Sequence, residues 1–120
     1  IQLLQRIIQP YAITQLTIEA VFAALEPTGV STARERVALL VRERELLASG
    51  LAASQRVVHV WPSAANFLLV EFTDAAEALK RAHAAGLLVR DFRNTPGLER
   101  ALRISVGSPE QNDRLLASLT

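Results

Sequence analysis

Two arginines stand inside apolar stretches that are typical of β-strands. Arg103 lies in "ALRISVG", residues 101–107, and Arg90 lies near the end of "GLLVRDF", residues 86–92. A guanidinium presents a planar fork of donors that fits a carboxylate or a phosphate, and an arginine on a strand has already lost part of its freedom. If both strands belong to one sheet, the two positions predict an anion-binding site. The alternative for each arginine alone is a surface position paired with a local carboxylate.

The rest of the sequence offers little catalytic chemistry. It has no cysteine and two isolated histidines, His59 and His83, so neither thiolate catalysis nor a zinc site is expected. It has no glycine-rich phosphate loop and no nucleophile elbow. The helix start "GSPEQ", residues 107–111, could receive an anion through its free amides, but Ser108 and Gln111 form a capping box that satisfies some of them, so we expect capping instead. We expect no catalytic residue and no metal site, so the isolated chain should not be an enzyme.

The composition argues against several classes of partner. Half of the 120 residues are hydrophobic, but no apolar run approaches the roughly 20 residues that a membrane-spanning helix needs. The net charge of +1 gives no general attraction to nucleic acid or to anionic lipid. We expect a cytoplasmic protein without nucleic-acid or membrane partners. Because the sequence opens at Ile1 with helical spacing, we also expect it to be a fragment.

The first half of the sequence predicts helices. Residues 1–9 have helical spacing and stop before Pro10, and residues 17–25 predict a second helix that ends at "EPTG", residues 26–29. Thr32 and Glu35 form a capping box for a long helix from about residue 33 to residue 53. Its apolar residues lie along one face, and its charged residues, Glu43 included, are expected mainly on the solvated faces.

The pattern changes period at Arg56. Residues 56–61, 66–72, 87–91 and 101–107 predict four strands. Asp74 caps a helix that Gly86 closes, and Ser108 caps a last helix from residue 109 to about residue 119. The predicted class is α+β: a long helix followed by β-β-α-β-β-α. A βαβ unit between the second and third strands should give a small mixed sheet with helices packed on one face.

Several stretches resemble one enzyme family. "AAGLLVRDF" and "TPGLERALRISVGSPEQNDRLLASL" resemble the C-terminal small domain of histidinol-phosphate aminotransferase, a pyridoxal-phosphate enzyme of the aspartate-aminotransferase fold. "SAANFLLVEF" and "RERVALLVRERELLASGL" resemble a strand and the interdomain helix of that family. "PYAIT", residues 10–14, departs from the family's usual "PYPLP"-like segment. The resemblance divides the chain into residues 1–16, an interdomain or large-domain segment, and residues 17–120, the small domain.

The resemblance implies roles for both arginines. Arg103 would bind the anionic group of the substrate, and Arg90 would assist it. The parent protein would transfer an amino group from glutamate to imidazole-acetol phosphate, giving 2-oxoglutarate and histidinol phosphate in histidine biosynthesis. Its cofactor would be pyridoxal phosphate, held by a lysine of the large domain, so this fragment would bind no cofactor itself. Lys80, the only lysine, lies outside any family lysine motif.

The resemblance also implies partners and leaves alternatives. The partners would be the missing large domain of the same polypeptide and a second copy of the full-length protein in a homodimer. Related aminotransferases and phosphothreonine decarboxylases share the arginine strand, so the small domain could belong to one of them. The remaining alternative is a free-standing regulatory or interaction module with the same core.

Overall fold

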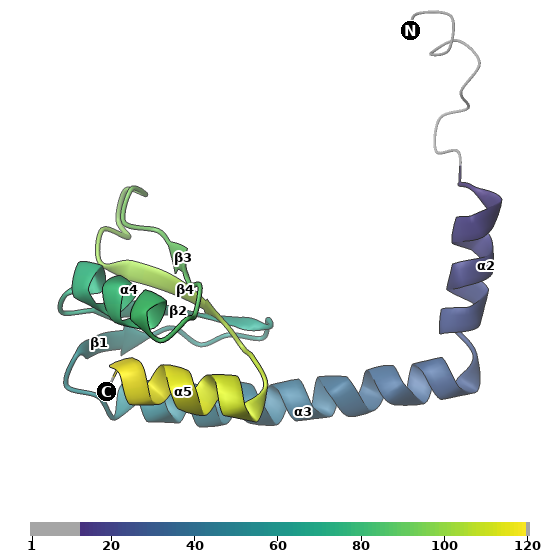
Figure 1. The fold of residues 1–120 in the computed structure, drawn as a ribbon, viewed down its shortest axis with the longest axis horizontal. Helices are drawn as coiled ribbons and strands as arrows, with labels where there is room; N and C mark the ends of the chain where they lie inside the picture. The colour runs from purple at the N-terminus through teal and green to yellow at the C-terminus, as the bar shows by residue number, and fades with distance from the viewer. Residues whose placement is uncertain (1–12, 120) are drawn as a thin grey trace, which may run out of the picture. The chain divides into compact units, whose positions relative to one another are not determined.

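The computed structural model describes residues 13–119, so the helix expected for residues 1–9 lies outside the described residues. The chain divides into two compact units, Ile1–Arg36 and Val37–Thr120. The second unit contains the strands of the described residues, which Figure 1 shows together with helices α4 (Ala75–Ala84) and α5 (Pro109–Leu119).

Two helices come first in the described chain. Helix α2, Gln15–Ala24, begins after Thr14, whose hydroxyl accepts a hydrogen bond from the Thr17 amide at 3.2 Å. Helix α3 runs over Pro27–Ala52, so the prediction that it starts near residue 33 is wrong. Proline is well tolerated in the first turn of a helix, where its missing N–H has no partner to lose. Thr32 therefore lies inside the helix, and its hydroxyl donates to the Thr28 carbonyl at 2.9 Å instead of capping.

The remaining elements follow the predicted order and confirm the α+β class. They are β1 (Val57–Val60), β2 (Phe67–Phe72), α4 (Ala75–Ala84), β3 (Arg90–Asp91), β4 (Ala101–Ser105) and α5 (Pro109–Leu119). Asp74 caps α4 by accepting from the Glu77 amide at 2.9 Å. Gly86 follows α4 with φ +73°, a left-handed conformation that glycine adopts without a steric penalty. The local signals thus place these helix ends correctly.

The sheet differs from the prediction in its pairing. Its strand order is β1-β2-β4-β3, and each of the three pairings is antiparallel, so the expected mixed sheet is not what forms in the described residues. Strands β2 and β3 still flank helix α4 in the chain, but β4 lies between them. The turn at Gly97, with φ +82°, sends the chain back beside β3, and β4 then fills the gap next to β2.

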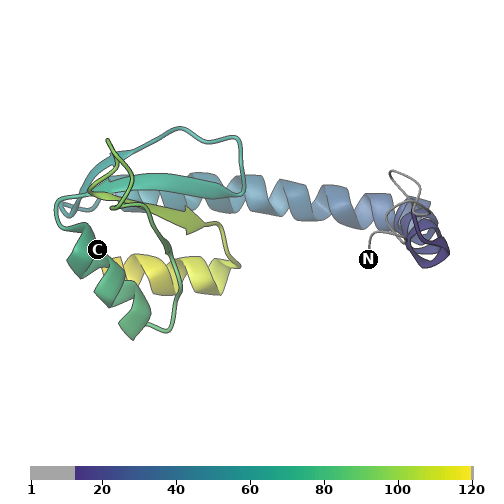
Figure 2. The same ribbon diagram turned by 90° about the horizontal axis from the view of Figure 1, so that it is seen from above.

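The hydrophobic core lies between the sheet and the helices. Along β2 the buried residues alternate, so that Leu68, Val70 and Phe72 face the core, and Leu102 and Ile104 of β4 join them. Helices α3, α4 and α5 supply Leu47, Leu51, Ala75, Ala78, Ala82, Leu115 and Leu119. Full burial of one such large side chain stabilises the fold by about 1.5–3 kcal/mol. Figure 2 shows α4 and α5 on one side of the strands, as predicted.

The side of the sheet opposite the core carries the strand residues that lie between the core-facing ones. In register, Leu69 of β2 lies opposite Arg103 of β4, and Arg103 lies opposite Arg90 of β3. We call this surface the open face and define it by Phe67, Leu69, Glu71, Arg90 and Arg103. Side chains alternate between the two faces of a strand, so these residues point away from the core.

Candidate anion-binding site

The two arginines singled out in the sequence are cross-strand neighbours. Arg90 pairs in register with Arg103, one on β3 and the other on β4. Directly opposed residues of an antiparallel pair have Cβ atoms about 4.5–5.5 Å apart. The strands therefore place the backbones of the two arginines opposite one another on the open face, with the Arg103 guanidinium over the Phe67 ring and the Arg90 guanidinium near the Phe92 ring.

Arg103 is held against an aromatic ring. Its guanidinium carbon lies 4.9 Å from the centre of the Phe67 ring, and the side chain is half-buried. Its Nε is buried and has no hydrogen-bond partner among the described residues. A buried donor without an acceptor is uncommon in native proteins and costs about 1–3 kcal/mol. The Arg103 side chain is thus fixed by packing while its hydrogen-bonding capacity stays partly unused.

The two acids on the neighbouring strand positions, Asp91 and Glu71, are paired with other arginines. Asp91 accepts from Nε and Nη2 of Arg93 at 2.9 and 2.7 Å, and these hydrogen bonds lower its pKa to about 2. Glu71 on the open face forms an ion pair with Arg100. Within residues 13–119 no carboxylate forms an ion pair with Arg90 or Arg103. The alternative of a local carboxylate partner for each arginine is therefore not realised in this part of the chain.

The electrostatics of the pair favour an external anion. Like charges directly opposite one another on adjacent strands destabilise a sheet. A phosphate carries about −1.5 to −2 charge near pH 7 and offers several acceptor oxygens. One such group could accept hydrogen bonds from both guanidinium groups and relieve their repulsion.

The helix α5 N-terminus is not a second anion site. The Gln111 amide donates to the Ser108 hydroxyl at 3.3 Å, and the Gln111 side chain accepts from the Ser108 amide at 3.0 Å, as the predicted capping box requires. Glu110 also lies there, and a hydrogen bond from the Ser108 hydroxyl lowers its pKa. Amides already satisfied beside a carboxylate are a poor receptor for another negative group.

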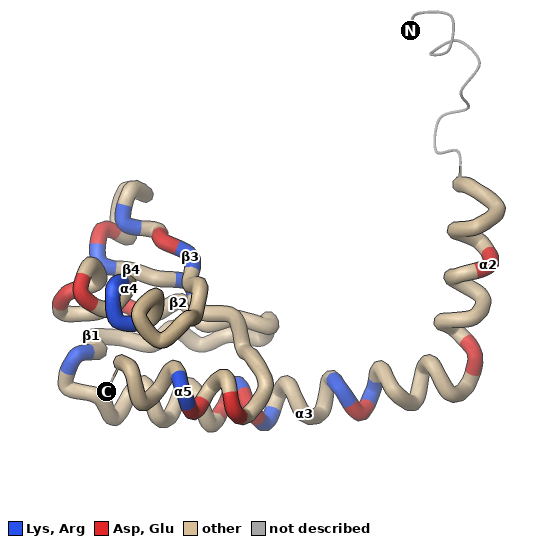
Figure 3. The backbone as a smooth tube through the Cα atoms, viewed as in Figure 1, with Lys and Arg blue, Asp and Glu red and all other residues tan. Residues whose placement is uncertain are grey.

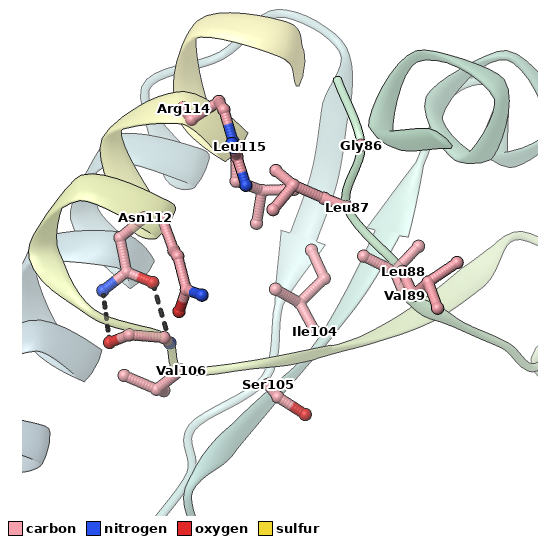
Figure 4. Close-up of a pocket in the computed structure, with 12 residues that line it drawn as sticks. Gly86, Leu87, Leu88, Val89, Ile104, Ser105, Val106, Asn112, Arg114 and Leu115 are labelled. Atoms are coloured by element: carbon pink, nitrogen blue, oxygen red, sulfur yellow. Dashed lines mark hydrogen bonds between the residues drawn. The ribbon is translucent and has the colours of Figure 1, made fainter. Parts of the chain in front are cut away.

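A pocket of about 430 Å³ lies near the arginine pair but does not include it. Figure 4 shows it between α5 and the segment that leads to β3, with Leu87, Ile104 and Leu115 among its lining residues. Arg114 and Gln111 also line it. The arginines instead project from the open face of the sheet, so the pocket gives no enclosed anion site.

The other polar candidates have ordinary surroundings. His59 packs edge-on against Trp61, with ring centres 4.8 Å apart, and His83 is in the last turn of α4. Lys80 is 82% exposed and lies 4.0 Å from Glu77, which is unsuitable for holding a cofactor as a Schiff base. Over the described residues, no group of three or more His, Cys, Asp or Glu could hold a metal ion. Nor does any helix in that range have the length and apolar character to cross a membrane.

The sequence did not predict that one polar residue, Glu43, is buried. Glu43 was expected on a solvated face of α3, but it is only 5% exposed. It lies four residues before Leu47 and eight before Leu51, both fully buried, and this spacing places it on the same face of the helix. That spacing was the available signal. Besides the exposed guanidinium of Arg42 at 3.5 Å, its partner is Asn112, which is also buried and 69 positions away.

Comparisons with known proteins cover the whole chain. No family model matches it. A histidinol-phosphate aminotransferase of Stenotrophomonas maltophilia is 46% identical over 120 residues, which are 100% of this chain and 33% of that protein. The enzyme of the same name from Xylella fastidiosa (strain 9a5c) is 43% identical over 119 residues, again 33% of its length. The chain thus spans about a third of the length of these relatives.

Solved structures agree with the sequence comparison. A protein from Burkholderia pseudomallei described as an aminotransferase is 34% identical, with a TM-score of 0.76 over 96% of this chain and 34% of that one. The histidinol-phosphate aminotransferase of Clostridium acetobutylicum has a TM-score of 0.79 at 19% identity, over 93% of this chain and 34% of that one, and so supports the fold alone. Together these findings confirm the resemblance to part of a histidinol-phosphate aminotransferase. They do not favour the free-standing module.

Proposed function

We propose that this chain is the small domain of a pyridoxal-phosphate-dependent histidinol-phosphate aminotransferase and that Arg103, assisted by Arg90, binds the anionic group of the substrate. The observation that carries this proposal is the opposed pair of arginines without a carboxylate partner within the described residues. The similarity to enzymes of that name over the full chain supports it. The reaction would exchange an amino group between glutamate and imidazole-acetol phosphate.

The chemistry of the two substrates suits one shared site. Histidinol phosphate carries a phosphate ester, and glutamate carries a carboxylate, so one group must accept either anion. A guanidinium fork binds both geometries with two parallel hydrogen bonds, and it stays charged at any physiological pH. Arg103 is held by Phe67 before the substrate arrives, so less freedom is lost when the anion binds.

The remaining chemistry belongs to other parts of the parent protein. Pyridoxal phosphate would supply the electron sink for the amino transfer. The only lysine of this chain is exposed on α4, so we infer that the cofactor lysine lies in the missing large domain and that this fragment binds no cofactor. On this proposal the full-length protein is a cytoplasmic homodimer.

Helix α2 gives a physical reason to expect the missing large domain as a partner. None of its residues is buried, although Leu16, Val21 and Phe22 are 78%, 49% and 71% exposed. Glu19 is the charged residue of its sequence, and Figure 3 shows the helix mostly in the colour of uncharged residues. A helix with large apolar side chains on several faces is normally covered in a larger protein. About two thirds of the relatives' length lies outside this chain and is available to cover it.

Phosphate titration of the 120-residue chain tests the anion site. Backbone amide shifts should change around residues 89–91 and 102–107, and Arg103→Ala should abolish these changes. Arg103→Lys should bind more weakly than the wild-type chain, because an ammonium cannot form the two-pronged contact. Arg114→Gln is the matched control, since it removes the same charge from α5. Equal loss of binding in Arg114→Gln and Arg103→Ala would reduce the effect to net charge and contradict the proposal.

A further inference from the structure

Two consecutive residues of helix α3 contact helix α5 and the loop before β2. The carboxylate of Glu43 accepts a hydrogen bond at 3.2 Å from Nδ2 of Asn112, which lies near the start of α5. The guanidinium of Arg44 donates through Nη1 to the Ala65 carbonyl at 3.3 Å, just before β2. The side chains of Glu43 and Arg44 are only 6% and 13% exposed. Both contacts join α3 to positions far away in the sequence.

Asn112 holds the corner between β4 and α5. Its Oδ1 accepts from the Gly107 amide at 2.9 Å, and its Nδ2 donates to the Gly107 carbonyl at 3.3 Å, as the dashed lines in Figure 4 mark. The Asn112 side chain therefore satisfies both backbone groups of Gly107, as a neighbouring strand would. Asn112 is 4% exposed, so water does not compete for these hydrogen bonds.

The hydrogen bond from Arg44 to the Ala65 carbonyl holds the turn that precedes β2. Ala65 lies in the turn whose Ser63 hydroxyl donates to the Phe67 carbonyl at 2.6 Å and accepts from the Ala65 amide at 3.1 Å. This turn sets the start of β2. Arg44 thus fixes the backbone two residues before Phe67.

The two loops meet at the arginine site. The Val106 amide donates to the Asn66 carbonyl at 2.9 Å, and Phe67 pairs in register with Ser105. The Phe67 ring in turn packs against the guanidinium of Arg103. The contacts made by Glu43 and Arg44 therefore fix the same end of the β2–β4 pair, where Phe67 supports Arg103.

We propose that Glu43, acting through Asn112, and Arg44, acting through Ala65, are positioning residues for Arg103. This rests on the proposed anion-binding function of Arg103. A buried carboxylate adds little net stability compared with an apolar side chain of similar volume. The Glu43 carboxylate instead fixes the orientation of the Asn112 side chain, because only one orientation of its amide can donate to Glu43 and accept from the Gly107 amide.

An exchange of the two side chains tests the proposal. Asn112→Asp places two carboxylates side by side and removes the donor to Glu43, so we expect the phosphate affinity of the chain to fall about fivefold or more. The double variant Glu43→Gln with Asn112→Asp restores one amide and one carboxylate with their roles reversed. Its phosphate affinity should recover in part, because an aspartate at position 112 can accept from the Gly107 amide and from a glutamine at position 43 but cannot donate to the Gly107 carbonyl.

Two further variants separate positioning from stability. Leu119→Ala removes a buried side chain at the far end of α5 and should lower the urea midpoint of unfolding without changing phosphate affinity. Arg44→Met removes the donor to Ala65 but keeps the apolar stem, and it should weaken phosphate binding as Asn112→Asp does. If Asn112→Asp keeps its affinity, or if Leu119→Ala loses as much, the positioning role is overturned. An affinity of the double variant no higher than that of Asn112→Asp would overturn it as well.

A second readout does not depend on phosphate. The buried Nε–H of Arg103 should give a protected side-chain signal in the nitrogen–proton NMR spectrum. We expect this signal to broaden or exchange faster in Asn112→Asp and to recover in the double variant. If the wild-type chain binds no phosphate, the proposed function fails, while this signal still decides the positioning role. An unchanged Arg103 signal in Asn112→Asp would overturn that role.

Discussion

Arg90 and Arg103 lie directly opposite one another on strands β3 and β4, and across residues 13–119 neither forms an ion pair with a carboxylate. Nearby acids, Asp91 and Glu71, are each paired with a different arginine. The sheet therefore keeps two like charges together although it has acids beside them. The repulsion between the two like charges should weaken the isolated fold slightly, and in the proposed function a bound anion would relieve it.

Removing one of the two charges should stabilise the chain and weaken its anion site. For Arg90→Gln we expect the free energy of unfolding at low ionic strength to rise by about 0.2–1 kcal/mol, because the cross-strand repulsion is lost. Arg90 also lies 5.8 Å from the Phe92 ring centre, near the outer limit of a cation–π contact, so little attraction is lost with it.

Urea unfolding at low salt and at about 0.15 M salt measures this effect, since added ions screen exposed charges. The gain in free energy of unfolding should shrink as salt is added. Arg90→Gln should bind phosphate more weakly than the wild-type chain at both salt concentrations. Arg114→Gln, which removes an equal charge from α5, should give neither change. A lower stability of Arg90→Gln than of the wild-type chain at low salt would contradict this explanation.

The sequence predicted those parts of the fold that local chemistry determines. Asp74, Gly86 and Ser108 mark helix ends by side-chain or backbone properties that act over three or four residues. The period of two along β2 likewise indicated which residues face the core. For the same reason Arg103 could be placed opposite its apolar neighbours before any strand pairing was known.

The parts that the sequence did not predict depend on distant contacts. Strand β4 lies between β2 and β3, and no local pattern states which strands become neighbours. The early start of α3 at Pro27 was hidden because proline also ends helices. The buried carboxylate of Glu43 accepts a hydrogen bond from Asn112, and the sequence of α3 alone gives no sign of that partner. The two opposed arginines could therefore be singled out from the sequence, but the contacts that support them could not.

The ion pair between Asp91 and Arg93 should give the chain an acid-dependent loss of stability. The hydrogen bonds from Arg93 lower the pKa of Asp91 from 3.8 to about 2. Because the folded pKa lies below the unfolded one, the pair stabilises the fold above about pH 4. That contribution is lost as the pH falls from 3.8 toward 2. Carboxyl-carbon NMR should show the Asp91 midpoint near 2.

Arg93→Ala provides the comparison for this titration. Without its partner, the Asp91 midpoint should move up toward 3.8. Glu99 is an internal control, because its pKa is lowered mainly by the Gly97 amide and should not respond to Arg93→Ala. If the Asp91 midpoint stays near 2 in Arg93→Ala, a group other than Arg93 lowers the pKa of Asp91.

Phe67 should set the affinity of the anion site without touching the anion. Its ring packs 4.9 Å from the Arg103 guanidinium carbon, so Phe67→Leu keeps an apolar side chain but removes the π-face that holds the arginine. A contact of this kind contributes about 0.5–1 kcal/mol, so the phosphate dissociation constant should rise about two- to fivefold. Phe92→Leu is the matched control, because its ring lies 5.8 Å from Arg90 and holds it less strongly. Phosphate titrations of both variants by calorimetry or NMR measure the difference. Equal effects of the two substitutions, or none for Phe67→Leu, would show that the ring does not orient Arg103.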